Sequence, residues 1–210
     1  MKITFIGIGN VGSALADGLA QAGHSIVIAA RDSSSQTVEK ALKQNSSFRV
    51  ASPAEAVDES EVVFLATPYE AASKALSGLS LKGKILIDCT NPVGSGVSHG
   101  LQSKSSGSEE IQKLAPDAKV VKAFTIVGYE NFENSSYPGY GELKPVMLIA
   151  GDDTKAKEVV SQFAAELGWR AQDAGPLSSA LHLEHICLLW VKISRVQGKG
   201  PNFVWSILER

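Results

Sequence analysis

The sequence predicts an α/β protein of the Rossmann type, a single domain built on a doubly wound, mostly parallel sheet. Three observations predict this class. Short apolar runs alternate with helical patterns along most of the 210 residues, as in chains that form a parallel sheet. The expected strands are apolar almost throughout, which is typical of strands covered on both faces. The first strand also runs straight into Gly7-x-Gly9-x-x-Gly12 and a helix, the setting of a dinucleotide-binding fingerprint.

The first half of the chain alternates regularly between strands and helices. The first helix places small and apolar residues on one face and is closed by Gly23. Pro53 opens a short acidic helix that ends near Asp58. The other elements are bounded by turn residues. In order, we expect strands 2–7, 25–30, 48–51, 61–66 and 84–89, with helices 10–22, 36–44, 53–58 and 69–77.

Two irregular stretches interrupt the second half. Residues 91–107 are rich in Gly and Ser and are expected to be a loop. Residues 125–144 carry four aromatic side chains, which argue against disorder, so this stretch is expected to be a substrate-pocket loop. The remaining elements are expected at helices 108–115, 153–167, 178–195 and 202–209 and strands 118–124, 145–150 and 169–173.

The end of the chain is expected to be helical over 178–209. The 178–195 helix is apolar nearly all round, so we expect it to be buried in the core or against a partner subunit. Asp152 and Asp153 precede the 153–167 helix and are expected to act as its N-terminal caps.

Composition excludes several classes of function. The formal net charge is −2, and no basic cluster suits nucleic acid or an anionic membrane. The apolar runs are far shorter than the roughly 20 residues of a membrane-spanning helix, and the first one belongs to a strand rather than to a signal peptide. Cys89 and Cys187 are expected to be buried thiols. We therefore expect a soluble, cytoplasmic protein whose partner is a small molecule.

The glycine turn is the expected phosphate site. Gly7 permits the tight turn, Gly9 lets the backbone approach a pyrophosphate, and Gly12 lets the helix pack closely on the strand. The N-terminus of the helix adds unpaired N–H groups and a partial positive charge.

Arg31 indicates which nucleotide is bound. NAD enzymes usually carry an acid after the second strand to hold the ribose 2′-hydroxyl, whereas Arg31 occupies that neighbourhood here. A guanidinium suits a 2′-phosphate, so the position favours NADP. Asp32 beside it weakens this preference.

Three further loops follow strands and should surround a nicotinamide ring. They contain Thr67-Pro68-Tyr69, Asn91-Pro92-Val93 and Thr125-Ile126-Val127-Gly128. In an open parallel sheet, ligands bind beyond the carboxyl ends of the strands.

Other motifs do not support a separate chemistry. Tyr140 and Lys144 have a dehydrogenase-like spacing, but they lie in a Pro- and Gly-rich loop, so we treat the match as chance. His182 and His185 have no third ligand at a zinc spacing, and His99 is isolated. No metal site is expected. The lack of an acid–base pair suits hydride transfer between two rings, which needs mainly positioning.

Several sequence blocks occur together in one order. They are Gly7–Gly12, Arg31, Thr67–Ala71, Asn91–Val93, Val121–Phe124, Gly151–Asp153 and Asp173–Ser178. Together these blocks resemble the NADP oxidoreductases that use the deazaflavin coenzyme F-420 (F420). They are also similar to the cytosolic domain of six-transmembrane ferric reductases, which binds NADPH and flavin.

This resemblance implies direct hydride transfer between NADP(H) and a stacked F420 or flavin (FMN or FAD), in a homodimer. It implies cofactor-binding residues Gly7, Gly9, Asn10, Val11, Gly12, Arg31, Ser33, Thr67, Pro68, Asn91 and Pro92. It implies a second-substrate pocket of Val93, Thr125, Ile126, Val127 and Tyr129. No side chain is required as an acid or base, and Thr125 and Tyr140 are the candidates if one acts.

Two other functions stay open. One is an NADPH-dependent flavin and ferric reductase with a soluble acceptor. The other is a module that senses NADPH without catalysis. In every case, residues 1–210 are expected to form one NADP-binding domain.

Overall fold

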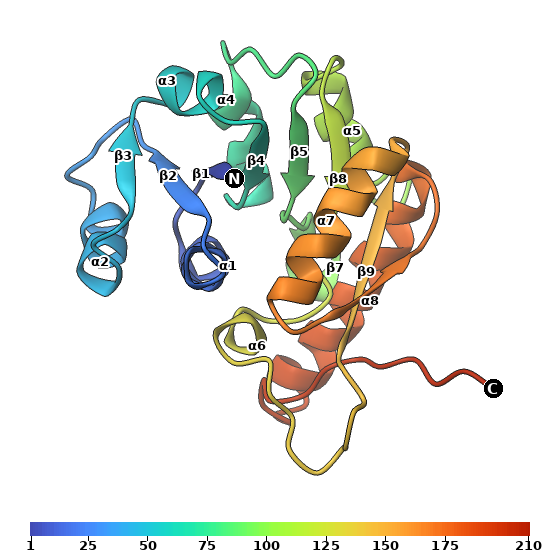
Figure 1. Ribbon diagram of the computed structural model, residues 1–210. Helices are drawn as coiled ribbons and strands as arrows, with labels where there is room; N and C mark the ends of the chain where they lie inside the picture. Colours follow the sequence, from blue (N-terminus) through green and yellow to red (C-terminus); the bar gives the residue numbers. More distant parts are fainter.

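The central sheet has eight strands in the order β10-β9-β8-β5-β4-β1-β2-β3 (Figure 1). The computed structural model describes all 210 residues. Strands β8 and β9 are antiparallel, and every other neighbouring pair in this sheet is parallel. The strand order reverses between β1 and β4, the point at which ligands bind in such sheets. The expected fold class is confirmed.

The strands and helices follow the predicted order. The strands of the large sheet are β1 Lys2–Ile6, β2 Ser25–Ala29, β3 Arg49–Ala51, β4 Val62–Leu65, β5 Ile85–Asp88, β8 Lys119–Lys122, β9 Val146–Gly151 and β10 Arg170–Asp173. The α-helices are α1 Asn10–Gln21, α2 Gln36–Gln44, α3 Pro53–Asp58, α4 Ala72–Leu76, α5 Gly107–Leu114, α6 Glu130–Glu133, α7 Thr154–Glu166 and α8 Ala180–Val191. Tight 3₁₀ turns precede α4 at Tyr69–Ala71 and α8 at Leu177–Ser179, and a π-helical turn follows α8 at Lys192–Val196.

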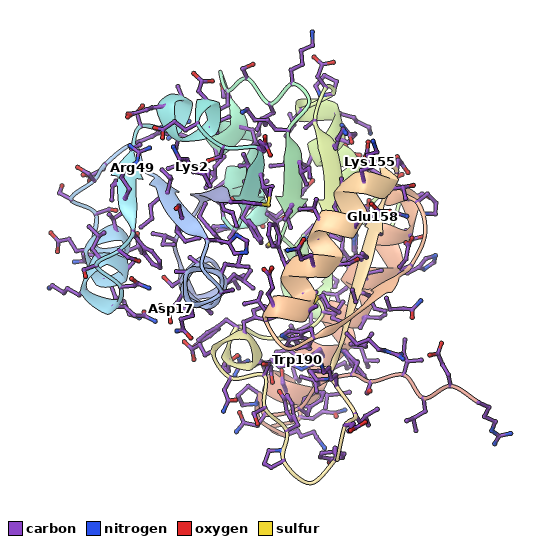
Figure 2. All side chains as sticks on the ribbon, viewed as in Figure 1. Lys2, Asp17, Arg49, Lys155, Glu158 and Trp190 are labelled. Atoms are coloured by element: carbon purple, nitrogen blue, oxygen red, sulfur yellow. The ribbon has the colours of Figure 1, made fainter.

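The core lies on both faces of the sheet. Phe5 of β1 and Phe64 of β4 are register partners whose rings stack 4.5 Å apart on one face. Ile6 and Leu65, one residue further along, belong to a second buried cluster on the other face. This explains why the strands are apolar throughout. Charged side chains such as Arg49 lie on the outside (Figure 2).

The predicted 202–209 helix is wrong, because this segment is extended. The backbone N–H of Val146 donates to the Trp205 carbonyl over 2.9 Å. The Trp205 indole N–H donates to the Ile126 carbonyl over 3.1 Å. Phe203 and Trp205 also pack against the main core. Tertiary partners have replaced the hydrogen bonds that a local helix would have made.

The 91–107 stretch contains more order than the expected loop. A small antiparallel hairpin joins β6 Val93–Gly94 to β7 Ser98–His99, with a 3₁₀ turn at Ser95–Val97 between them. Val97 lies at φ 58°, a left-handed conformation that is rare for a β-branched residue.

One expectation about the C-terminal half needs correction. Asp153 caps α7 by accepting the Ala156 N–H, but the Asp152 carboxylate instead accepts the Leu177 N–H over 2.9 Å. Within one chain, one side of helix α8 is exposed, with Leu189 at 49%, so its burial against a partner subunit stays a prediction.

The thiols and the helix lengths complete the description of the fold. Cys89 and Cys187 are buried free thiols, as expected. Burial raises the pKa of Cys187 to about 11. None of the helices has the length and apolar character needed to cross a membrane.

Candidate functional site

Five loops meet at the carboxyl edge of the parallel strands. They follow β8, β5, β4, β1 and β2, which lie side by side in the sheet in that order. The parallel registers bring the ends of these strands to one edge. Sequence blocks that are far apart in the chain are therefore gathered in one region.

The glycine turn has the geometry of a phosphate cradle. Gly7 lies at φ +97°, and a Cβ there would be 2.6 Å from the Ala66 carbonyl oxygen. A Cβ on Gly12 would lie 2.2 Å from the Gly7 carbonyl oxygen, so helix and turn touch. A Cβ on Gly9 would meet nothing within 4 Å. Backbone is thus close-packed below the turn and open above Gly9, where a pyrophosphate could approach.

A cavity of about 230 Å³ adjoins this turn. Helix α1 begins at Asn10, and no side chain caps its first turn. The N–H groups of that turn are therefore available to an anion. The opposite wall comes from α2 and includes the cationic side chain of Lys40. The cavity is lined by Ile8, Gly9, Asn10, Ser13, Gln36, Thr37, Lys40, Gln44 and Glu133.

Asp32 and Arg31 behave differently at the end of β2. The Asp32 carboxylate accepts the Ser34 N–H over 2.9 Å and the Ser34 hydroxyl over 2.6 Å. These hydrogen bonds hold the pKa of Asp32 below its usual value and commit the carboxylate to its own turn. Arg31 is exposed and donates to the Lys74 carbonyl at the edge of α4. Ser33, which follows Asp32, is exposed.

Four buried polar atoms at this edge have no hydrogen-bond partner. They are Thr67 Oγ1, Thr90 Oγ1, Asn91 Oδ1 and Thr125 Oγ1. They come from the loops after three adjacent strands, β4, β5 and β8, and the Asn91 amide donates to the Thr125 carbonyl over 3.2 Å. An unpartnered buried polar atom is costly, and such atoms are rare in native proteins. A cluster of them fits the hydroxyl and amide groups of a ribose and a nicotinamide.

The five predicted second-substrate residues divide into two kinds. Thr125, Ile126 and Val127 are buried, and the last two belong to the main core. Val93 is 39% exposed, and Tyr129 is partly exposed at the start of α6. The preceding Phe124 lies at φ 56°, an uncommon conformation that turns the chain sharply after β8.

Tyr140 lies on the outer part of the 125–144 loop and is 66% exposed. With Tyr137 and Phe203, it lines a cavity of about 230 Å³ between this loop and the C-terminal segment. The larger cavity, of about 620 Å³, is a groove between α1, α6 and the end of α7.

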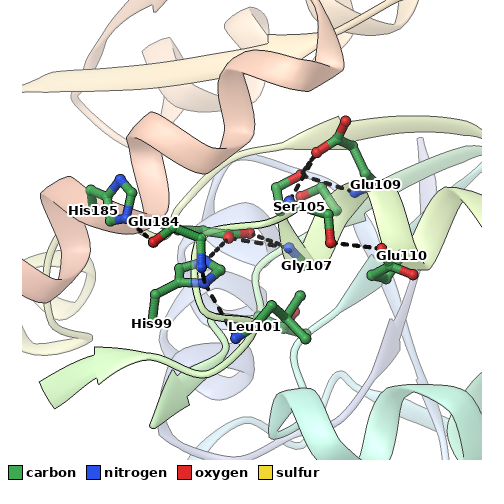
Figure 3. A network of polar contacts seen from close by, with 12 residues as sticks. His99, Leu101, Ser105, Gly107, Glu109, Glu110, Glu184 and His185 are labelled. Atoms are coloured by element: carbon green, nitrogen blue, oxygen red, sulfur yellow. Dashed lines mark hydrogen bonds and ion pairs between the residues drawn. The ribbon is translucent and has the colours of Figure 1, made fainter. Parts of the chain in front are cut away.

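Sequence reasoning missed a buried charged network behind the site. Lys122 at the end of β8 lies 3.1 Å from Asp88 and 3.1 Å from Glu184. His99 lies 2.7 Å from Glu184, so it is not isolated as expected (Figure 3). Burial lowers the pKa of Lys122, but the two carboxylates outweigh this effect, and the net pKa is raised. The sequence did carry a signal for this network, because two apolar strands end in an acid, Asp88, and in a lysine, Lys122.

Known proteins are similar to this chain over most of its length. The profile of the family described as NADP oxidoreductase, coenzyme F420-dependent, matches residues 2–92. The F420-dependent NADP reductase of Methanothermobacter marburgensis is 30% identical, over 95% of this chain and 96% of that protein. A crystal structure of a proposed F420-dependent NADP reductase from Arthrobacter sp. FB24 has a TM-score of 0.85 and 27% identity, with 100% of both chains covered.

A second relative is longer. Metalloreductase STEAP3 of Rattus norvegicus is 32% identical over 188 residues, which are 89% of this chain and 36% of STEAP3. The chain thus spans about a third of that protein's length.

The fold and the carboxyl-edge site define an NADP-dependent oxidoreductase of the Rossmann type. The chain belongs to the F420-dependent NADP oxidoreductase family, since it aligns over nearly the full length of an established member.

Proposed function

We propose that the protein transfers hydride between NADP(H) and the deazaflavin F420. The observation that carries this proposal is the cluster of four unpartnered polar atoms beside a glycine turn that is open above Gly9. The near full-length similarity to an F420-dependent NADP reductase supports the choice of acceptor.

The nucleotide would lie across the carboxyl edge. Gly7, Gly9 and Gly12 would shape the pyrophosphate site, with the N–H groups of Asn10 and Val11 as donors. Arg31 and Ser33 would hold the 2′-phosphate, because Asp32 is turned into its own loop.

The nicotinamide end of the nucleotide would lie further along the edge. Thr67, Asn91 and Thr125 carry the unpartnered atoms that could bind its ribose and carboxamide. Pro68 and Pro92 turn the chain in the loops that follow β4 and β5. Val93 and Tyr129 are the exposed candidates for contact with the acceptor ring.

This chemistry asks little of side chains. The nicotinamide supplies a hydrogen with two electrons to the acceptor ring, the acceptor takes one proton from solvent, and NADP⁺ remains. The protein's part is to hold two rings with the reacting carbons roughly 3–3.5 Å apart and to limit the access of water. No residue needs to act as a general acid or base.

A flavin acceptor that passes electrons to ferric iron is the second candidate. The similarity to the metalloreductase STEAP3 over 89% of the chain favours it. It requires the same NADPH site and differs only in the acceptor.

NADPH oxidation measured against F420, FMN, FAD, riboflavin, quinones and ferric chelates separates these functions. We expect F420 to give the highest kcat/KM. A higher value with FMN or FAD, together with reduction of ferric chelate, would support the second candidate instead. Tight NADPH binding without turnover on any acceptor would indicate a sensing module.

Replacement of Thr125 or Tyr140 tests the absence of an acid. Thr125→Val and Tyr140→Phe should each lower kcat by roughly tenfold or less, since each removes a positioning group and not a proton donor. NADPH affinity, measured by titration, should be nearly unchanged in Tyr140→Phe and should fall by less than about tenfold in Thr125→Val, which loses one hydrogen bond to the nucleotide. A loss of several orders of magnitude in kcat would point to a carbonyl or imine substrate.

A further inference from the structure

We propose that the buried network of Asp88, Lys122, Glu184 and His99 is a positioning device for the nicotinamide half of the site. The inference rests on the proposed function, because it assigns the nicotinamide to the loops after β5 and β8. None of these four residues faces the carboxyl-edge surface, since all are buried, so they would act through the backbone that they hold.

The network binds both the backbone N–H and the backbone carbonyl of Thr90. The Thr90 N–H donates to Asp88 Oδ1 over 2.9 Å, and the Lys122 ammonium donates to the Thr90 carbonyl. Asp88 and Lys122 are register partners at the ends of β5 and β8. The ammonium also donates to Asp88 Oδ2, so the two side chains that bind Thr90 are themselves joined by an ion pair. The orientation of the loop after β5 is therefore set by two charged side chains beneath it.

The groups held in this way are the unpartnered ones. Thr90 Oγ1 and the neighbouring Asn91 Oδ1 are buried without hydrogen-bond partners, and Thr125 Oγ1 lies across from them in the loop after β8. The Asn91 amide, in turn, is tied to the Thr125 carbonyl. The network holds the backbone of this loop and leaves the neighbouring side-chain atoms unpaired, which would leave those atoms free to bind a ligand.

Glu184 connects the Asp88–Lys122 pair to the β6–β7 hairpin and to α5. Its carboxylate accepts the Gly107 N–H over 2.9 Å, binds Lys122, and lies 2.7 Å from His99 Nε2 (Figure 3). His99 Nδ1 accepts two backbone N–H groups, from Leu101 and Ser103. Nδ1 must then carry a lone pair, so Nε2 carries the proton and donates a hydrogen bond to Glu184.

Stability alone gives little reason for such a cluster. Buried ion pairs pay a desolvation cost that often cancels their attraction, and well-packed apolar residues can replace them without loss. The side chains of Lys122, Asp88 and Glu184 are 0% exposed. Their position directly behind the unpartnered atoms is the property that apolar substitutes would not reproduce.

The test compares two nucleotides in three variants. Ser108→Ala removes the hydroxyl that donates to Asp88 Oδ2 over 2.6 Å, which loosens the network mildly. Lys122→Met removes the central cation. Lys119→Met is the matched control, because Lys119 lies on the same strand and its ion pair with Asp153 is partly exposed. Affinities are measured for NADPH and for 2′,5′-ADP, which lacks the nicotinamide half, together with kcat.

We expect Ser108→Ala to weaken the binding of NADPH about threefold or more, and Lys122→Met to weaken it about tenfold. The kcat of Lys122→Met should also fall by about ten- to a hundredfold. Binding of 2′,5′-ADP should change by less than about twofold in both. Amide exchange in the ligand-free variants should increase over residues 89–107 and stay unchanged in the glycine turn. The control should match the wild type.

Equal losses for both nucleotides, or no change in the ratio of their affinities, would overturn the inference and leave a merely structural network. If Lys122→Met does not fold, Ser108→Ala decides between these outcomes. A wild-type protein that binds neither nucleotide would instead refute the proposed function.

Discussion

The three glycines of the first turn have separate physical roles. Gly7 needs its left-handed backbone, and Gly12 needs the lack of a side chain against the Gly7 carbonyl. Gly9 needs neither, because its backbone is extended and the space above it is free. A requirement for glycine at position 9 would therefore come from a ligand and not from the fold.

Gly9→Val should fold and fail to bind NADPH. The added side chain would occupy the space of the pyrophosphate, while the free energy of unfolding should change by no more than about 1 kcal/mol. Gly12→Ala is the contrasting variant, and it should be less stable because its Cβ would lie 2.2 Å from a carbonyl oxygen. Urea unfolding and NADPH titration measure both effects. Normal binding in folded Gly9→Val would show that the nucleotide lies elsewhere.

Arg31→Ala should lose affinity for NADPH and keep its affinity for NADH. A charge-assisted contact to a 2′-phosphate is worth about 1.5–3 kcal/mol, or roughly ten- to a hundredfold. Arg49→Ala is the control. Arg49 is also exposed, but it lies at the start of the outermost strand β3, away from the carboxyl edge, and pairs with Glu59. Equal losses for NADPH and NADH would remove Arg31 from the 2′-phosphate site.

At the scale of elements, α8 and the segment after it organise the region beyond β8. The buried face of α8 carries Glu184 into the charged network. The indole of Trp190, near the end of α8 (Figure 2), donates to the Phe203 carbonyl over 3.0 Å and so holds the C-terminal segment against the helix. Asn131 of α6 also donates to the Pro201 carbonyl. The loop expected to border the acceptor is thus held by the end of the chain.

Trp205→Phe should lower the free energy of unfolding by about 1 kcal/mol, because it keeps most of the ring packing but removes the hydrogen bond to the Ile126 carbonyl. Leu208→Ala is the control in the same segment, since Leu208 is 83% exposed and should change stability by less than about 0.5 kcal/mol. Urea titrations compare them. Equal stability of the two variants would mean that the segment does not hold the loop.

At the scale of the whole molecule, one apolar region remains on the surface beside the sheet edge. Ile186 and Leu189 of α8 line an apolar cavity of about 170 Å³ together with β9 and the C-terminal segment. Its lining is Val146, Leu148, Ile186, Leu189, Trp205 and Ile207. Only one side of the apolar helix α8 is therefore buried within one chain. This favours a second copy of the chain as the partner that buries the other side.

We predict a homodimer that buries this region. The sedimentation mass at micromolar protein should be near twice 22.2 kDa, and Leu189→Asp should reduce it to that of one chain, because burial of a leucine is worth about 1.5–3 kcal/mol. Leu114→Asp on α5 is the matched control, as both leucines are 49% exposed. A wild-type mass of one chain would contradict the prediction.

Most of the fold could be predicted from sequence. The strands of the large sheet, most helices up to residue 195 and the glycine turn follow from apolar periodicity and turn residues within short windows, whereas β6, β7 and α6 lie in stretches expected to be loops. The extended 202–209 segment could not, because its partners are Ile126 and Val146 rather than its own neighbours. The sequence left open whether α8 is buried in the core or against a partner, because periodicity does not tell which side of an apolar helix another chain would cover; within one chain Leu189 is exposed.

By itself, the sequence determined the order of the elements, the phosphate turn and the presence of Arg31 after the second strand, because these depend on residues that are close together in the chain. Only the tertiary structure decided that Thr67, Thr90 and Thr125 end with unpartnered atoms at one edge. It alone joined Asp88 to Lys122 across 34 residues and His99 to Glu184 across 85. The reason is physical: a buried charge is tolerated only where distant segments supply its partner, and that pairing leaves no local pattern in the chain.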